Sequence, residues 1–231
     1  MTIKTLETEQ FILNYPLHLE NFVFNSINFF NERSHYLYSL FNERLNKIKV
    51  IIFDNKTDFH QYISFISKGK IPPLSWASGC CYNNEIQIIV DPTNLNELNN
   101  KITILAHETT HLYFNNLIYK KYKIKRIRWF DESYANYIDG KIKLKTKETI
   151  ILKANSLLEI SDTFDMNSLN ELNALNDTHY NVYDMFLLIG KYIFESKLHK
   201  IYLHKLINEP KSIIEIGKYI LNDAIKHVLN S

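Results

Sequence analysis

The pattern of hydrophobic and polar positions predicts three short strands in the first half of the chain. The segments "EQFILNYP" (9–16), "KIKVIIF" (47–53) and "NEIQIIV" (84–90) are short runs rich in Val, Ile and aromatic residues. Pro16 stops the first run, and Asp91-Pro92 ends the third. Such bounded apolar runs are typical of buried β-strands.

Segments with the apolar spacing of helices follow each of these runs. Apolar residues recur three and four positions apart in residues 20–45 and 57–68, and a further helix is expected from about residue 95 to residue 117. The resulting order, strand–helix repeated three times, predicts an α+β arrangement in which a small sheet backs long helices.

The second half of the chain shows few strand signals. Residues 131–138 begin a helix that Asp131 is expected to cap, and residues 182–207 are predicted to form one helix. We therefore expect a single domain over residues 1–231, with an α+β lobe at 1–118 and a mainly helical lobe at 119–231.

Composition bounds the class of protein. The chain has 231 residues, of which 45% are hydrophobic, so it can bury a sizeable core. With 27 basic and 25 acidic residues, the net charge of +2 is too small to indicate a nucleic-acid partner.

The basic stretch from Lys120 to Arg128 is interpreted as a solvated linker, either a loop or a short exposed strand. The alternatives are steering of acidic substrates or membrane surfaces, and a nucleic-acid contact for which no reader motif is present.

The cysteines and the N-terminus bear on the compartment. Cys80 and Cys81 are adjacent, so we expect free thiols rather than a disulfide. The first residues contain no apolar run of the signal-peptide type, and no stretch approaches 18 apolar residues. We predict a cytoplasmic protein without a membrane span, although a mature secreted chain would carry the same letters. The sequence does not indicate an oligomeric state.

The chemistry is concentrated in "ILAHETTHLYF" (104–114). On a helix His107 and His111 share a face, so both imidazoles can reach one ion. Zinc accepts neutral imidazole nitrogen and prefers four ligands. Glu108 is rotated by about 100° from His107, beside the ion, where it can take a proton from a water whose pKa the metal lowers. The alternative is an ordinary helix in which the two histidines bind no metal.

A third protein ligand is needed. The extended pattern H-E-x-x-H-x-x-G-x-x-H is excluded, because Phe114 and Leu117 occupy its glycine and histidine positions. The other known solution takes a glutamate from a following helix. Glu132 meets that requirement, since it lies in "RWFDESYANYI" (128–138), about twenty residues after His111.

These two segments together resemble the gluzincin zinc metallopeptidases. "AHETTHLYF" followed by "RWFDESYANYI" is similar to the group whose zinc-binding helix precedes a Trp-Phe/Leu-x-Glu-Gly-x-Ala-x-Tyr segment. The resemblance implies a zincin-like fold with an active-site cleft between the two lobes. It also implies that His107, His111 and Glu132 bind one Zn²⁺ per chain and that Glu108 is the general base.

The match to the family departs at two places. Ser133 stands where the family usually has glycine, which is a minor change at a helix start. The Gly-x-Met-Glu-Asn segment of the related aminopeptidases is absent, and the corresponding region contains "CCYNNEIQIIVDP" (80–92). This favours an endopeptidase acting on peptide or protein substrates.

Secondary roles are assigned as hypotheses. Asn136 lies on the same helical face as Glu132, so its carbonyl could accept the ring N–H of a metal-bound histidine; the null is a surface asparagine. The resemblance implies a Tyr or His that stabilises the oxyanion. Tyr180 is the first candidate for that catalytic role, and His179 and Tyr183 are the alternatives.

The region ahead of the zinc-binding helix also has two interpretations. Residues 78–81, leading into the strand at 84–90, could form a rim on which an extended substrate pairs with the strand edge, or they could be an ordinary part of the sheet. The functional prediction is a zinc-dependent peptidase. The alternative is a catalytically inactive interaction or regulatory protein that keeps the zincin fold.

Overall fold

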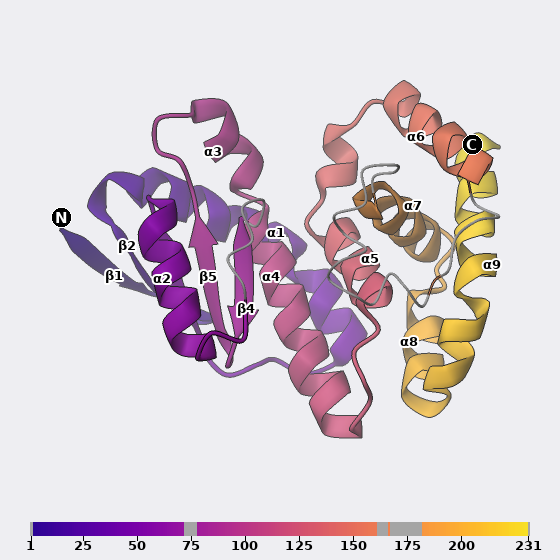
Figure 1. Ribbon diagram of the computed structural model, residues 1–231, viewed down its shortest axis with the longest axis horizontal. Helices are drawn as coiled ribbons and strands as arrows, with labels where there is room; N and C mark the ends of the chain where they lie inside the picture. Colours follow the sequence, from indigo (N-terminus) through magenta and orange to yellow (C-terminus); the bar gives the residue numbers. More distant parts are fainter. Residues whose placement is uncertain (1, 72–77, 161–165, 167–181, 231) are drawn as a thin grey trace. The chain divides into compact units, whose positions relative to one another are not determined.

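The structure is a computed structural model in which residues 2–71, 78–160, 166 and 182–230 are described. The chain divides after Tyr113 into two compact units, residues 1–113 and 114–231. The sequence predicted a boundary between residues 118 and 119, five residues further on. Within the described residues, the first unit contains all the strands, and the second is helical (Figure 1). Together they make an α+β chain, as the sequence predicted.

A mixed five-stranded sheet organises the described part of the first unit. Its order is β1 (Ile3–Glu7), β2 (Phe11–Pro16), β3 (Ile48–Phe53), β5 (Glu85–Ile89) and β4 (Gly79–Tyr82). The central pairs β2–β3 and β3–β5 are parallel, and the outer pairs β1–β2 and β4–β5 are antiparallel. The sequence prediction missed β1, because this edge strand is largely exposed and has no clear apolar run.

The strand β4 was also missed as a separate element. It forms a hairpin with β5, in which Tyr82 pairs with Glu85 across the two residues Asn83 and Asn84. Both asparagines have positive φ, 50° and 64°. A two-residue turn with this conformation matches the right-handed twist of the strands and favours Asn and Gly. The hairpin places β4 at the edge of the sheet.

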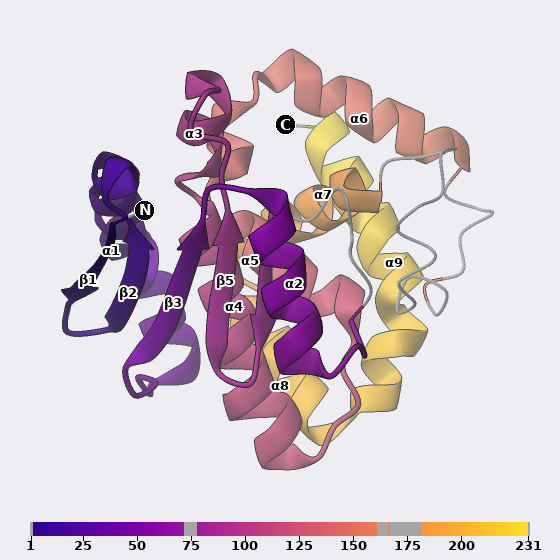
Figure 2. The ribbon, with the colours of Figure 1, turned by 60° about the vertical axis from the view of Figure 1, so that its left-hand side comes forward.

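The two faces of the sheet are covered by different helices. On one face Val50, Ile86 and Ile88 are almost fully buried, on the side of α1 (Glu20–Phe41) and α4 (Ile104–Tyr113). On the other face, α2 (Lys56–Ser67) contributes to a small apolar cluster with β5 and the Cys80 side chain. Figures 1 and 2 show α2 and α4 on opposite faces of the sheet.

The helix predicted for residues 95–117 is interrupted. Its first part is α3 (Leu95–Lys101), which Asn94 caps by accepting a hydrogen bond from the Glu97 N–H at 3.0 Å. After a break at residues 102–103, α4 begins, and a π-helical segment (Phe114–Lys120) follows it directly. Short π-helical segments are rare and are often found next to functional sites. The periodicity alone could not separate these pieces, because all three have helical spacing.

The described elements of the second unit are helical. They are α5 (Arg128–Ile138), a 3₁₀ turn (Lys141–Leu144), α6 (Lys147–Ile160), α7 (Val182–Glu195), α8 (His199–Asn208) and α9 (Pro210–Leu229). The core contains the fully buried rings of Trp129, Phe130 and Tyr134. Phe130 and Tyr134 lie 4.8 Å apart between ring centroids. Among the described residues, no helix is both long and apolar enough to cross a membrane.

Two predictions for this unit need correction. The helix predicted at 182–207 is two helices, because Lys197 takes a left-handed φ of 59° that ends α7. Asp131 is not a helix cap: α5 begins three residues earlier, at Arg128, with Ile127 as its N-cap. The Asp131 side chain instead accepts hydrogen bonds from Arg126. Residues 124–127 form a loop, which is one of the two forms that the sequence analysis left open for the basic stretch.

Candidate metal centre

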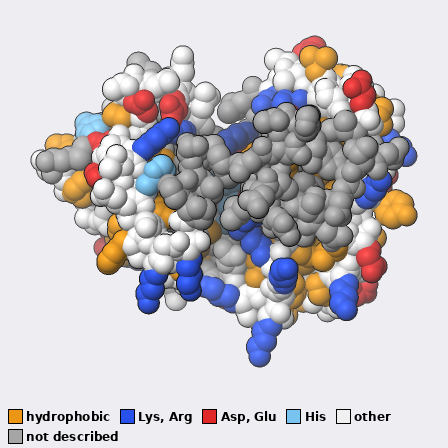
Figure 3. All heavy atoms as spheres, in the orientation of Figure 1, with side chains coloured by type: hydrophobic (Ala, Val, Ile, Leu, Met, Phe, Trp, Pro, Cys, Tyr) orange, Lys and Arg blue, Asp and Glu red, His pale blue; other side chains and the backbone are white. Residues whose placement is uncertain are grey.

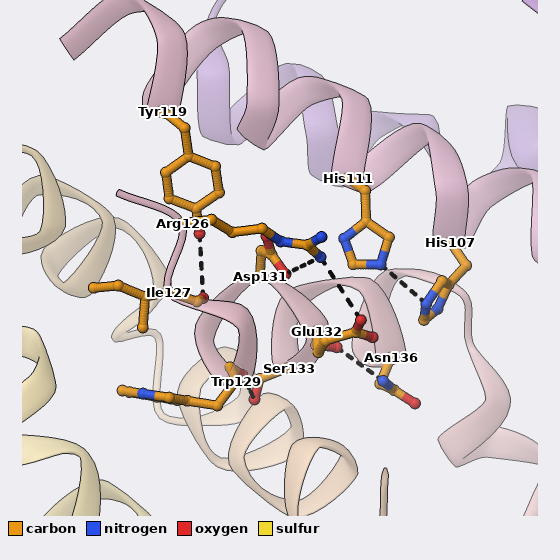
Figure 4. A network of polar contacts seen from close by, with 10 residues as sticks. All are labelled: His107, His111, Tyr119, Arg126, Ile127, Trp129, Asp131, Glu132, Ser133 and Asn136. Atoms are coloured by element: carbon orange, nitrogen blue, oxygen red, sulfur yellow. Dashed lines mark hydrogen bonds and ion pairs between the residues drawn. The ribbon is translucent and has the colours of Figure 1, made fainter. Parts of the chain in front are cut away.

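The two histidines of α4 lie side by side. The Nε2 atoms of His107 and His111 are 3.2 Å apart, and their ring planes are inclined by 81° (Figure 4). The spacing of four residues produces this arrangement, since residues i and i+4 are neighbours on one helical face. The helix alone therefore brings two potential ligand nitrogens together.

Their separation fits a shared zinc ion. Zinc–nitrogen bonds are about 2.0–2.1 Å long, and ligands at tetrahedral angles on one ion are then about 3.4 Å apart. The observed 3.2 Å between the two Nε2 atoms is close to that value. Two neutral imidazoles that bind one ion would each offer a lone pair to it, so a cation suits this pair well.

The rest of α4 is adapted to burial. The hydroxyl groups of Thr109 and Thr110 donate to the carbonyls of Leu105 and Ala106, at 2.6 and 2.9 Å. These bonds satisfy two buried polar groups within the helix itself. The "TT" of the motif therefore needs no outside partners, and α4 can be buried with its histidines in place.

Tyr113 fixes the end of α4 against α1 and the loop that follows it. Its ring contacts Phe41, with 5.4 Å between ring centroids, and its hydroxyl accepts a hydrogen bond from the Leu45 N–H at 3.4 Å. Burial raises the pKa of Tyr113 to about 12. The hydroxyl therefore stays neutral to a higher pH than that of an ordinary tyrosine.

Glu108 lies next to the edge strand β4. Its side chain is 8% exposed. A Cβ placed on Gly79 would lie 2.6 Å from Glu108 Oε1, so the carboxylate and the backbone of β4 are in close contact. Glu108 thus stands beside the histidine pair on α4, in the position that the sequence predicts for a general base.

The predicted third ligand, Glu132, lies on α5 in the second unit. This helix is held by its apolar residues: Trp129 and Phe130 are fully buried. The Ser133 hydroxyl donates to the Trp129 carbonyl at 2.6 Å, so serine at this position is accommodated inside the helix. The difference from the family's glycine therefore leaves α5 intact. Glu132 is 7% exposed.

Arg126 pairs with the acidic residues at the start of α5. Its guanidinium donates two hydrogen bonds to the Asp131 carboxylate, at 2.6 and 2.9 Å, and its Nη2 lies 3.7 Å from Glu132 Oε1 (Figure 4). Asp131 is fully buried. The two-pronged pair neutralises the Asp131 charge. Arg126 is also within ion-pair distance of Glu132, so both carboxylates at the start of α5 share its positive charge.

The three predicted ligands form a group that could hold a metal ion. One ligand atom from each of His107, His111 and Glu132 can be chosen such that all lie within 4.8 Å of one another. Two imidazole nitrogens and one carboxylate oxygen suit zinc and also other divalent transition metals.

Asn136 makes a different contact from the one predicted. Its Nδ2 donates to the Glu132 backbone carbonyl at 2.8 Å. The amide is therefore engaged with its own helix, and a hydrogen bond from a histidine ring to its oxygen stays a prediction.

The hydroxyl of Tyr119 donates to the Ile127 carbonyl at 3.2 Å and so fastens the loop before α5. Burial raises the pKa of Tyr119 well above its usual value.

The predicted oxyanion donors are only partly within the described structure. Tyr180 and His179 lie outside the described residues. Tyr183 lies in the first turn of α7, where its ring contacts Phe186 with 5.7 Å between centroids. The role of each in catalysis stays a prediction.

Two residues near the candidate site were missed by the sequence analysis. Arg126 was grouped with the basic stretch, although its position five residues before Asp131 offered a signal for pairing. Gly79 was considered only as part of the possible rim at residues 78–81. Its contact with Glu108 gave no signal, because that contact depends on how β4 packs against α4. Figure 3 shows Lys and Arg side chains at several separate places on the face it draws, with no single dominant basic surface there.

No protein-family model matches the chain, and no curated protein matches it. The candidate metal centre is therefore defined by the residues of this chain alone.

Proposed function

We propose that this protein is a zinc-dependent peptidase, acting on peptide or protein substrates as an endopeptidase. The observation that carries the proposal is the grouping of His107, His111 and Glu132, with Glu108 adjacent to the histidine pair. The gluzincin resemblance of the two motifs points to the same residues. The donor set of two imidazoles and one carboxylate is that of catalytic zinc sites, in which a fourth position is kept for water or substrate.

Zinc in such a site lowers the pKa of water and polarises the carbonyl of the substrate. His107 and His111 would hold the ion through Nε2, and Glu132 would supply a carboxylate oxygen. The Arg126–Asp131 pair would hold the start of α5, so that the Glu132 carboxylate is presented in a defined orientation.

Glu108 would move the proton. Its carboxylate accepts a proton from the attacking water as the new carbon–oxygen bond forms at the peptide carbonyl. The same proton passes to the amide nitrogen as the carbon–nitrogen bond breaks, and a carboxylic acid and an amine leave. Glu108 returns to its starting state, so one carboxylate completes the cycle.

The test combines metal analysis with a single substitution. We expect about one zinc per purified chain and cleavage of a mixed peptide library. Glu108→Gln keeps the shape of the side chain but removes the base, so we expect cleavage to fall by a factor of about 10² to 10⁴ with zinc retained. The library would also reveal which peptide bonds are cut.

Glu97→Gln is a matched control. Glu97 lies on α3, in the same unit, and pairs with Lys101 on the same helix. This variant should cleave the library at the wild-type rate. Zinc binding without cleavage by the wild-type protein would reject the peptidase proposal and support an interaction protein that keeps the metal. Absence of bound metal would reject both.

A further inference from the structure

The start of the edge strand β4 is fixed by the sheet. Gly79 pairs with Ile88 of β5, and the Ile89 N–H donates to the Ser78 carbonyl at 3.0 Å. The backbone on both sides of Gly79 is therefore anchored to β5. A change of side chain at this position cannot easily be relieved by moving the strand.

The space above Gly79 is filled by Glu108. A Cβ at Gly79 would lie 2.6 Å from Glu108 Oε1, 2.9 Å from its Cγ and 3.0 Å from its Cδ. Favourable contacts between such atoms begin at about 3.5 Å. The backbone of Gly79 is not in the left-handed region, so its conformation does not demand glycine. Glycine is required at this position only because a side chain would clash with Glu108.

The two partners in this contact differ in freedom. The backbone of Gly79 is tied into the sheet, and the α4 backbone is held by its own hydrogen bonds and by Tyr113 at its end. The Glu108 side chain has rotatable bonds and can swing away. A methyl group at position 79 would therefore displace the carboxylate and leave the fold largely intact.

We propose that Gly79 is a positioning residue for Glu108: the missing side chain leaves the volume that the carboxylate occupies beside the histidine pair. The catalytic consequence rests on the proposed peptidase function, whereas the steric coupling between the two residues does not. Displacing a general base by about an ångström is enough to slow a reaction about 100-fold.

The kinetic test uses Gly79→Ala in the zinc-loaded full chain. We expect kcat on a cleaved library peptide to fall about 100-fold, with KM within about threefold of wild type and zinc still at one per chain. In a Glu108→Asp background the carboxylate is one methylene shorter, so Gly79→Ala should lower kcat by less than about threefold. A kcat equal to that of wild type in Gly79→Ala would overturn the proposal.

Cys80→Ala is the matched control on the same strand. Cys80 is the next residue, but its side chain packs in the apolar cluster with Phe59 and Ile63, on the opposite face of the sheet. This variant should keep the wild-type kcat. A loss in it equal to that of Gly79→Ala would mean that β4 is generally sensitive and would reject a specific role for Gly79.

A melting experiment decides the inference without any activity. Gly79→Val introduces a larger side chain, and we expect it to lower the melting temperature by about 5 °C when Glu108 is present. In a Glu108→Ala background the same substitution should lower it by no more than about 1 °C. Equal losses in both backgrounds would overturn the inference. If the wild-type protein cleaves no peptide, the proposed peptidase function is rejected. The melting temperatures of these variants then test the role of Gly79 on their own.

Discussion

The two units contribute to the candidate site in different ways. In the sheet-containing unit, His107, Glu108 and His111 lie on one helix, and the spacing of the letters already sets their geometry. In the helical unit, Glu132 is a single residue whose position depends on where α5 begins and on what packs against it. The first contribution is local, and the second is made by tertiary packing.

The two close glycine contacts show the same difference. At Gly79, an added Cβ would meet the end of a flexible side chain, Glu108. At Gly190 on α7, it would lie 2.2 Å from the Ser133 backbone oxygen on α5. One glycine makes room for a functional group, and the other lets two helices approach. We expect a substitution at the first to affect chemistry and a substitution at the second to affect folding.

The largest effect should come from zinc and should test whether Glu132 shares the ion with the histidines. At a free zinc concentration 1,000 times Kd, the free energy of unfolding should rise by about 4 kcal/mol over the metal-free protein. Glu132→Gln removes the ligand charge and should reduce this gain by at least about 1 kcal/mol, measured by urea unfolding at the same zinc concentration. Glu148→Gln, in the first turn of α6, is the control and should keep the full gain. An undiminished gain in Glu132→Gln would show that α5 supplies no ligand.

A smaller effect should follow from adding a side chain where α7 and α5 are in close contact. Gly190→Ala forces two backbones apart, and we expect a loss of about 3 kcal/mol in the free energy of unfolding. Gly217→Ala on α9 is the matched variant, because the added Cβ would meet side-chain atoms of Trp129 and Met166 at 3.0 Å or more. It should stay within about 1 kcal/mol of wild type, since alanine also favours the helix. Chemical denaturation of both variants would check this, and equal losses would contradict the packing argument.

The smallest effect concerns pH and the end of α4. Burial raises the pKa of Tyr113 to about 12 from an ordinary value of 10.0. Above pH 10 the unfolded chain releases this proton while the folded chain keeps it, so the contribution is complete below pH 10 and is lost as pH rises to 12. At pH 11 the loss should be about 1 kcal/mol, with allowance for solvent screening of the hydroxyl.

Tyr113→Phe should remove the part of the decrease in the free energy of unfolding at high pH that comes from Tyr113. Urea unfolding at pH 8 and pH 11 measures it in both proteins. Some loss should persist in the variant, because burial also raises the pKa of Tyr119 and Tyr134 in the helical unit. An identical pH dependence in the two proteins would contradict the assignment to Tyr113.

Most of the regular elements could be predicted, and the failures have physical causes. Strands β2, β3 and β5 follow from short apolar runs, and helices α1 and α2 follow from apolar periodicity, because each of these elements buries apolar side chains. The edge strand β1 has no such face, and the hairpin strand β4 depends on a turn formed by Asn83 and Asn84. The start of α5 was misplaced because Asp131 is typical of a cap, whereas here it pairs with Arg126.

The sequence by itself determined the chemistry of the site: two imidazoles and a carboxylate on one helix, and a second carboxylate in a motif further along. Helical periodicity is a local property, so five letters suffice to place His107, Glu108 and His111 relative to one another. Only the tertiary structure decided that Gly79 faces Glu108 and that Gly190 allows α7 to pack closely against α5. These contacts depend on volumes and on neighbours distant in the chain, and such information is not carried by the spacing of letters.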